Sequence, residues 1–171
     1  KKRRRNMANA ISDLKTTLGA GVRTTKYKVN INTPGSLDTI DTLCKATSFP
    51  QVTIGQIEVW SQGRKAMLQG ETEFDNTWDV TFYETEDHSL RSEFIQWMKD
   101  IDDTKTNTHV DEVAMKTAKV FQLDGAGEET AEYEFTNLWP QVVSSLEMSD
   151  DSVNAIGEFT VTFSFDFWEK N

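Results

Sequence analysis

The sequence predicts a mainly β fold: an antiparallel β-sandwich or barrel with one flanking α-helix. Three observations indicate this class. About eight stretches alternate apolar and polar residues as strands do, turn residues separate these stretches, and one segment has helical spacing. The clearest strand is GEFTVTFSFDFWE, in which Phe159, Val161 and Phe163 fall on every second position. The 171 residues are enough for one domain with its own core.

The chain begins with a stretch that has no strand pattern. Residues 1–24 predict a weakly ordered N-terminal arm with a short helix, and residues 25–171 predict a single β domain. The first strand of this domain is KYKVNI, whose apolar residues alternate with polar ones. After a turn, DTLCKAT predicts a second strand, which Pro50 ends because proline donates no hydrogen bond to a sheet.

A hairpin is expected over residues 51–70. GQIEVW and KAMLQG flank a four-residue turn, Ser61 to Arg64, and Gly63 within it accepts the backbone angles that tight turns require. The turn is followed by Lys65, so the hairpin carries two basic residues at its tip in a chain that is otherwise acidic.

A strand and a helix follow the hairpin. NTWDVTFY alternates apolar and polar residues, and Asp87 is expected to cap the helix after it. In this helix apolar residues recur at helical spacing, which is typical of a face that packs on a core. The sequence therefore predicts four aromatic core residues: Trp78, Phe82, Phe94 and Trp97.

The remaining segments predict a loop, a second hairpin and the closing strand. Residues 102–116 show neither period and predict a long loop. AKVFQL and EYEFTNL bracket the acidic turn DGAGEE, which indicates a hairpin. LWPQVVSSLEM and another acidic turn then lead into the long aromatic strand at the end. Such a strand favours aggregation wherever its edges stay unpaired.

The charge distribution is strongly uneven. The net charge is −10, and five of the 18 basic residues are Lys1 to Arg5. Between Asp124 and Glu169 there are eleven carboxylates and no Lys or Arg. Such a surface repels nucleic acid instead of binding it. No apolar run approaches the ~18 residues of a membrane-spanning helix, so no membrane partner is expected.

No catalytic arrangement emerges from the residues. Glu71 with Glu73, and Glu132 with Glu134, are spaced to share a strand face, but further acids surround each pair, which favours a solvated strand face over acid–base chemistry. Cys44 fits a small core residue, and one cysteine with two histidines cannot form a Cys/His zinc cluster. The sequence therefore predicts no enzyme, no cofactor and no metal site.

Two stretches resemble the tail tube proteins of contractile-tailed bacteriophages. The first is CKATSFP followed by GRKAMLQGETEFDNTWDVTFYETEDHSLRSEFIQWMKDI, which carries an F-D-x-W-x-V-T strand, with one extra residue, and an R-x-x-F-x-x-W helix. The second is NLWPQVVSSLEMSDDSVNAIGEFTVTFSFDFWE, with its L-W-P and its closing F-W-E. Together they cover about residues 43–169. The residues that carry the first pattern are Phe74, Asp75, Trp78, Val80, Thr81, Arg91, Phe94 and Trp97.

The resemblance implies a structural subunit that assembles with copies of itself. In this family, subunits join into hexameric rings whose sheets form one continuous inner barrel, and the rings stack into a tube inside a contractile sheath. The implied partners are the sheath, the baseplate with its tube initiator, the tail terminator, and viral DNA that passes through the lumen without specific binding. The implied location is the tail of the virion, assembled in the cytoplasm of the bacterial host.

Within such a tube, we expect two sets of surface residues. The hairpin and the last strand are expected to contact neighbouring subunits, since edge pairing between copies closes a sheet. The candidates for these contacts are Arg64, Lys65, Phe159, Val161 and Phe163. The candidates for an acidic lumen wall, which would repel DNA, are Glu58, Glu71, Glu73, Glu132 and Glu134.

Other functions stay open on the sequence alone. A related contractile injection or secretion apparatus uses a tube of this kind with protein as its cargo, and the tube initiators of baseplates share the fold, although they are usually longer. From other classes come a carbohydrate-binding β-sandwich, suggested by five tryptophans, and a glycosidase, which needs two carboxylates facing across a cleft. Rings or tubes in electron micrographs would favour the first class, and monomers the others.

Overall fold

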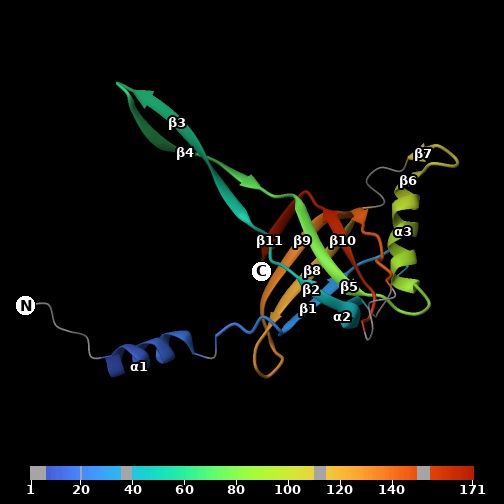
Figure 1. Ribbon diagram of the computed structural model, residues 1–171, viewed down its shortest axis with the longest axis horizontal. Coiled ribbons are helices and arrows are strands. Elements are labelled where there is room, and N and C mark those ends of the chain that lie inside the picture. Colours follow the sequence, from blue (N-terminus) through green and yellow to red (C-terminus); the bar gives the residue numbers. More distant parts are fainter. Residues whose placement is uncertain (1–6, 20, 36–39, 110–114, 150–154) are drawn as a thin grey trace, which may run out of the picture.

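The computed structural model describes residues 7–19, 21–35, 40–109, 115–149 and 155–171. Most of these residues form a compact body around a curved sheet of seven strands, and two elements project from it (Figure 1). The projections are helix α1 (Met7–Leu18) and the hairpin of β3 (Val52–Ser61) and β4 (Arg64–Phe74). The expected mainly β, antiparallel fold is confirmed.

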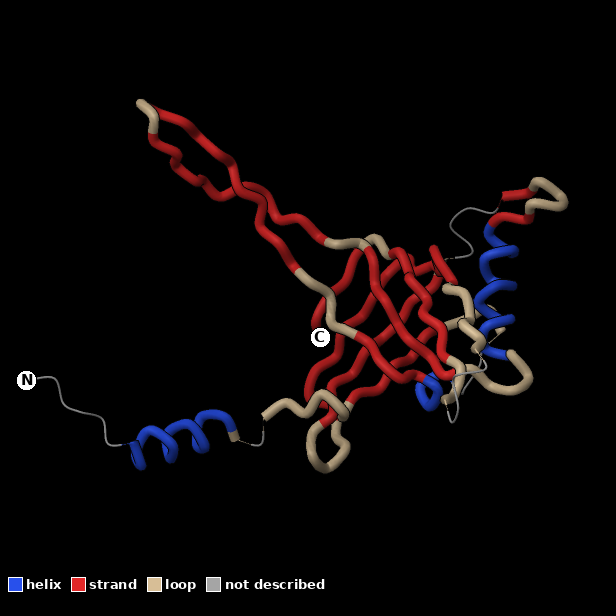
Figure 2. The backbone as a smooth tube through the Cα atoms, viewed as in Figure 1, coloured by secondary structure: helices blue, strands red, loops and turns tan. Residues whose placement is uncertain are grey.

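The sheet has the strand order β1-β8-β9-β10-β5-β2, with β11 beside one half of β9. Every pairing in it is antiparallel. It is an open sheet and not a closed barrel, because the outermost strands each pair on one side only within the described part of the chain (Figure 2). The strands are β1 (Tyr27–Ile31), β2 (Cys44–Thr47), β5 (Thr77–Tyr83), β8 (Lys116–Leu123), β9 (Glu129–Val143), β10 (Glu158–Ser164) and β11 (Phe167–Lys170).

The long strand β9 joins the two halves of the sheet. It continues from the predicted second hairpin through the LWPQ segment, and it pairs first with β11 and then with β10. Two irregularities bend it: Asn137 has φ 56°, and the register with β10 shifts between Thr162 and Phe163. Such bulges add a residue and increase the local twist, so one strand can follow a strongly curved sheet.

The core lies between the two halves of the curved sheet and helix α3 (Ser89–Ile101). Trp78 stacks on Phe135 with ring centroids 4.6 Å apart, and Phe94 of α3 contacts Phe82 at 5.4 Å and Phe163 at 5.7 Å. Interlocked aromatic rings of this kind bury much apolar area and fix the helix on the sheet. The four aromatics predicted as core are each at most 2% exposed: Trp78, Phe82, Phe94 and Trp97.

The starts of two elements differ from the sequence prediction. DTLCKAT is not one strand, because its first part forms the helical turn α2 (Ile40–Leu43), which places Ile40 in the core. The N-cap of α3 is His88, in the left-handed region at φ 51°, and its side chain makes no capping bond. Asp87 instead accepts a hydrogen bond from the Ser89 amide at 3.3 Å and from the Thr85 hydroxyl at 2.5 Å.

The segment predicted as a long loop, residues 102–116, begins with regular structure. Two short strands, β6 (Asp102–Asp103) and β7 (Thr108–His109), pair directly after α3. The end of the segment is already part of β8, and residues 110–114 lie outside the described part of the chain. No helix among the described residues is both long and apolar enough to cross a membrane.

Candidate functional site

The outer face of the sheet, which turns away from α3 and the core, is mostly polar, although Val142 and Phe167 are exposed on it as well. In its middle, side chains hydrogen-bond across β5 and β10: the hydroxyl oxygens of Thr81 and Thr160 lie 3.1 Å apart, and the Thr162 hydroxyl donates to Asp79 at 2.5 Å. Both pairs are directly opposite in the ladder. Such cross-strand pairs stabilise a sheet, and here they leave a surface of hydroxyls with few isolated charges.

A row of polar and charged residues crosses the other half of the outer face. Asn30, Lys119, Glu134 and Glu169 lie abreast on β1, β8, β9 and β11. The Lys119 Nζ atom is 2.6 Å from a carboxylate oxygen of Glu132 and 3.2 Å from one of Glu134. These hydrogen bonds raise the pKa of Lys119, and the bond from Lys119 lowers the pKa of Glu132. Two of the five expected lumen acids therefore share one lysine.

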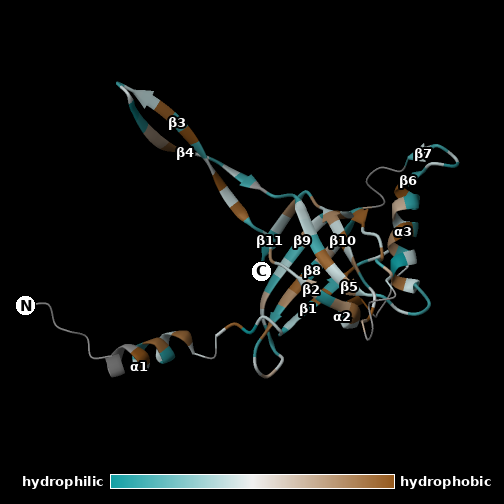
Figure 3. Ribbon diagram, in the orientation of Figure 1, coloured by the Kyte–Doolittle hydropathy of each residue, from teal (hydrophilic) through white to brown (hydrophobic). Residues whose placement is uncertain are grey.

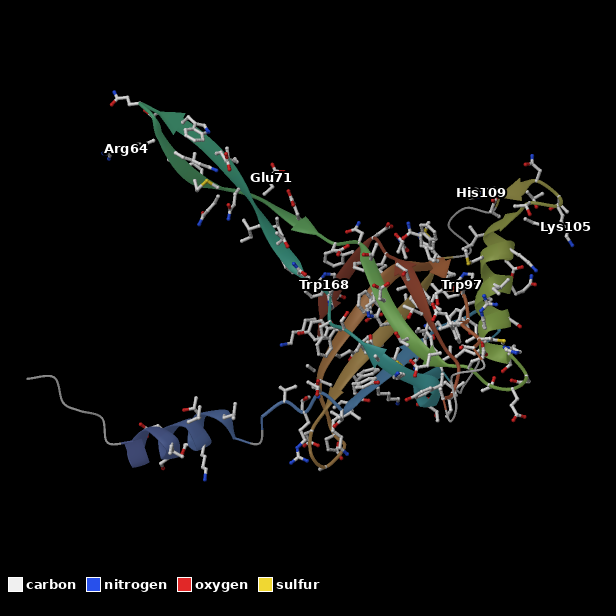
Figure 4. All side chains as sticks on the ribbon, viewed as in Figure 1. Arg64, Glu71, Trp97, Lys105, His109 and Trp168 are labelled. Atoms are coloured by element: carbon white, nitrogen blue, oxygen red, sulfur yellow. The ribbon has the colours of Figure 1, made fainter. Side chains whose placement is uncertain are left out.

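The other three expected lumen acids lie on the projecting hairpin and not on the sheet. Glu58 forms an ion pair with Lys65 of the same hairpin. Glu71 and Glu73 belong to the half of β4 that is nearer the body, as Figure 4 shows for Glu71. The five acids thus occupy two separate surfaces. Glu132 and Glu134 lie together because they occupy alternate positions of one strand, β9, beside Lys119 of β8, whereas the length of the hairpin separates the other three acids from them.

The tip of the hairpin is a tight two-residue turn. Gln62 and Gly63 have φ 47° and 76°, which is the left-handed backbone that such turns need. Lys65, one of the two expected contact residues, is engaged within its own hairpin by Glu58 and by the ring of Trp60, whose centroid is 5.9 Å away. Arg64 forms no ion pair among the described residues and stands at the far end of the projection (Figure 4).

Four apolar residues lie together on one side of the outer hairpin. Ile57 pairs with Leu68 and Val59 with Ala66, and the spacing of two places all four on one side of the ribbon. We call these four residues the tip face. Ile57, Val59 and Leu68 are 52%, 41% and 54% exposed. Figure 3 shows the resulting hydrophobic segments far from the body. An exposed apolar patch on a projecting element is typical of an interaction site.

The hairpin changes character halfway along its length. The ladder shifts register between Ile54 and Gln56, and the two strands cross there in Figure 2. A Cβ atom on Gly70 would lie 2.8 Å from the backbone of Gly55, so this close crossing requires glycine. Nearer the body, the side of the ribbon that continues the tip face carries Glu73, which lies over Gly55. This side is therefore acidic at its base and apolar at its end.

Strand β10, the first part of the predicted closing strand, does not provide the contacts that its pattern suggested. Phe159, Val161 and Phe163 were expected to meet neighbouring subunits, but they are at most 2% exposed within the single chain. Their strand, β10, pairs with β9 on one side and β5 on the other, so it lies in the middle of the sheet. Its apolar residues face the core, and it has no free edge for a neighbour.

The free edges belong to short strands instead. β1, β2 and β11 each pair with one strand among the described residues. The first two approach one another, since the Tyr27 hydroxyl donates to the carbonyl oxygens of Cys44, at 3.3 Å, and of Lys45. No backbone ladder joins them in the described structure. β11 forms its ladder with β9 alone among the described residues.

A groove lies beside the start of α3. It runs between residues 84–88 and the segments 144–149 and 155–160. The Glu84 carboxylate is buried in its wall, 3.4 Å from the Nδ1 atom of His88. Among the described residues, no three His, Cys, Asp or Glu side chains gather as ligands of a metal ion would.

The sequence matches the phage tail tube protein family over residues 13–171. The chain belongs to this family. It is 34% identical over 134 residues to tail tube protein gp19 of Enterobacteria phage T4, and the match covers 74% of this chain and 78% of the relative. Tail tube protein gp19 of Enterobacteria phage T6 matches with the same identity and coverage. The resemblance seen in the sequence is confirmed, and so is the function that it implied for the chain, that of a phage tail tube protein.

Solved structures of contractile assemblies contain chains with the same fold as this tail tube protein. One is in the tube-terminating cap of the anti-feeding prophage, with a TM-score of 0.63, 15% identity, and coverage of 88% of this chain and 90% of that one. Another is in the PVC sheath-tube complex in its extended state, with a TM-score of 0.58, 14% identity, and coverage of 94% and 96%. Identities this low establish the fold alone.

Three features of this tail tube protein were not deduced from its sequence. The tip face could have been found by pairing GQIEVW with KAMLQG about the turn, since the register then puts four apolar residues on one side. The exposed stripe of α1 could have been found from the spacing of Ile11, Leu14 and Leu18. The free edge of β11 had no sequence signal, because neighbouring strands cannot be read from chain order.

Proposed function

We propose that this chain is the repeating subunit of the tube in a contractile phage tail. Six copies close into a ring, rings stack into a tube, and the viral DNA passes through its lumen. The membership of the family and the 34% identity to the tail tube protein of phage T4 support this proposal. Residues 25–171 act as one tube domain with no catalytic role, and residues 1–24 form an arm attached to it.

The observation that carries the proposal is an incomplete sheet joined to an unsupported hairpin. A two-stranded hairpin is at best marginally stable in water, yet this one holds Ile57 and Leu68 more than half exposed. The strand β11 pairs with a neighbouring strand on one side only in the described structure. Both features are liabilities for a monomer. Both are resolved when neighbouring copies pair with the edge and cover the hairpin.

The outer face of the sheet is our proposed lumen wall. It carries hydroxyls in its middle and, beside them, carboxylates that outnumber the lysines: Asp79, Glu132, Glu134, Glu158 and Glu169 with Lys28, Lys45 and Lys119. A lysine held between two glutamates, as Lys119 is, presents little free positive charge to a phosphate. Such a wall repels DNA weakly and binds none of it, which suits fast passage.

The tube would occupy the centre of the tail. We propose that the sheath surrounds it, that a tube initiator in the baseplate starts it and that a terminator ends it. Chains of the same fold in an anti-feeding prophage baseplate, in its tube-terminating cap and in a sheath-tube complex support these roles for the fold. The protein would then be a component of the virion, assembled in the cytoplasm of the bacterial host.

Electron microscopy of the purified protein tests this function. We expect rings with sixfold symmetry that stack into tubes as the protein concentration rises. Monomers at every concentration would contradict the proposal, and rings of another symmetry would contradict the hexamer.

A charge reversal tests the assignment of the lumen wall. In assembled tubes, Glu132→Lys with Glu169→Lys should make the channel retain DNA, and raising the salt concentration should release it, because phosphate contacts displace counterions. The matched control is Asp100→Lys, on α3, which should leave DNA retention unchanged. Tubes of the double variant that retain no DNA at low salt would show that the lumen lies elsewhere.

A further inference from the structure

Helix α1 is an amphipathic helix whose apolar face is exposed in the described structure. Ile11, Leu14 and Leu18 follow the i, i+3, i+7 spacing of one helix face and are 56%, 61% and 62% exposed. Figure 1 shows α1 standing apart from the body on an extended connection. A helix of 12 residues is marginal in water unless its apolar face packs against something. The exposed stripe of α1 therefore calls for an apolar surface elsewhere.

The tip face of the hairpin is a surface that matches this stripe in size. From Ile11 to Leu18, the stripe spans about 10 Å along the helix axis. The tip face consists of two successive cross-strand pairs on one side of the ribbon, which are about 7 Å apart along the strands. With the width of its side chains, it covers the length of the stripe. In a single copy, both surfaces are exposed and they belong to separate projections.

The charges on one flank of each surface are complementary. The first 26 residues of the chain contain eight Lys or Arg and one Asp, whereas the rest of the chain is strongly acidic. Lys15, four residues after Ile11, lies on the flank of the stripe. On the hairpin, Glu73 continues the side that bears the tip face. Complementary charges of this kind fix the register of two surfaces that meet through apolar contacts.

We propose that α1 of one copy of this chain packs on the tip face of the hairpin of another copy, with Lys15 directed toward Glu73. The inference rests on the proposed self-assembly and adds which surfaces meet. Each copy both gives a helix and receives one, so the contact links copies in a head-to-tail series, as a heterologous interface does. It also covers two apolar surfaces that are exposed in the described structure.

Disulfide trapping in assembled material tests this contact. The parent is Cys44→Ala, which removes the single cysteine, and the variant adds Leu14→Cys and Leu68→Cys. Mild oxidation of its tubes should give a ladder of covalent dimers and higher oligomers on a non-reducing gel, since a disulfide forms only where Cα atoms come within about 7 Å. The matched controls are the two single-cysteine variants, which should stay monomeric on the gel.

The outcomes separate this inference from the proposed function. Tubes of the double variant that give no ladder would overturn the docking of α1 while leaving tube assembly intact. Dimers from Leu68→Cys alone would show two hairpins packed on each other, and a cross-link within one chain would show docking in cis; each overturns the inference. A parent that forms no rings or tubes would instead contradict the proposed function.

A charge exchange tests the same contact without cysteines. Lys15→Glu should raise the critical concentration for assembly about two- to fivefold, the range expected for an exposed ion pair. Adding Glu73→Lys should restore the parental value. The matched control is Lys15→Glu with Glu169→Lys, which should not restore it. Equal assembly of all these variants, or rescue by the control as well, would overturn the pairing of Lys15 with Glu73.

Discussion

Strand β10 in the body and the projecting hairpin have the same alternating pattern but opposite surroundings. In β10 the alternate apolar residues are at most 2% exposed, while Ile57, Val59 and Leu68 of the hairpin are 41–54% exposed. The difference does not lie in their residues. β10 has a strand on each side and α3 over its apolar face, whereas the hairpin has no described neighbour beyond its own two strands. The body is completed by its own chain, whereas we propose that other copies complete the hairpin.

This contrast also separates what holds the fold from what holds the assembly. The body keeps its core through contacts within the chain, such as Phe94 of α3 on Phe163 of β10. The tip face of the hairpin contributes little to a monomer, because its residues are not removed from water there. Changes in the body should therefore reduce the stability of the monomer, and changes in the hairpin should reduce assembly.

The largest effect is expected in the body. Trp97→Ala should lower the free energy of unfolding by about 3–5 kcal/mol, because it leaves a cavity between α3 and the sheet. Thermal melting of the monomer measures this loss, and insoluble protein would be its extreme form. The matched control is Trp60→Ala on the hairpin, where the side chain is 67% exposed; the expected change is within about 0.5 kcal/mol. Equal melting temperatures of the two variants would contradict the distinction between the body and the hairpin.

The next effect concerns the hairpin. Leu68→Asp should abolish tubes or raise the critical concentration at least about tenfold, equivalent to 1.4 kcal/mol, because a carboxylate enters an apolar contact. The melting temperature of the monomer should stay unchanged. Sedimentation of assembled material gives the critical concentration. The matched control, Gln69→Asp, places the same charge on the opposite side of the ribbon and should assemble. If Leu68→Asp assembles like the parent, the tip face is not an interface.

A smaller effect is expected at the free edge of β11. Asn171 donates its amide to β9, so by alternation the amide of Lys170 points away from β9 toward a neighbour. Lys170→Pro removes this donor without disturbing the existing ladder and should weaken ring closure. Lys170→Ala, which keeps the amide, is the control and should close rings normally. The fraction of closed rings in micrographs compares the two, and equal fractions would mean that no copy pairs with this edge.

The smallest effect concerns the Lys119 contact on the outer face. The lowered pKa of Glu132 stabilises the fold above its ordinary value of 4.5, and this contribution is lost as pH falls through the lowered value. The raised pKa of Lys119 stabilises the fold at pH values below its ordinary value of 10.5. This contribution to stability is lost as pH rises through the raised value. Lys119→Met should therefore melt slightly below the parent at neutral pH, with a gap that narrows in acid. A gap that widens in acid would contradict the ion pair.

The strands and the core aromatics follow directly from residue patterns. Alternation in KYKVNI and NTWDVTFY, and the helical spacing of Leu90, Phe94 and Trp97, depend only on which side of an element meets apolar neighbours. Helix α2 was missed because four residues are too few to show a helical period, and their apolar residues also suit a strand. The N-cap of α3 is His88 and not the predicted Asp87, because His88 takes a left-handed conformation that its sequence does not predict.

The assembly surfaces were harder to predict, for a physical reason. Phe159, Val161 and Phe163 show an apolar side but not what covers it, and in the structure it is covered by this chain's own core. The sequence predicted the hairpin, but the alternation of apolar and polar residues does not show that the chain projects from the body after Pro50. Chain order does not determine which strands are neighbours. The sequence therefore predicted a free edge on the long aromatic strand, whereas in the structure the free edge belongs to β11.

Hydrogen exchange measured on monomers and on assembled tubes tests the central claim most directly, because it reports how well each backbone amide is protected. In the monomer, amides of β10 should exchange slowly and those of the outer hairpin, around Ile57 and Leu68, rapidly. In tubes, the hairpin should become protected while β10 changes little. A hairpin that exchanges rapidly in tubes, or one already protected in the monomer, would contradict the claim that copies of this chain complete it.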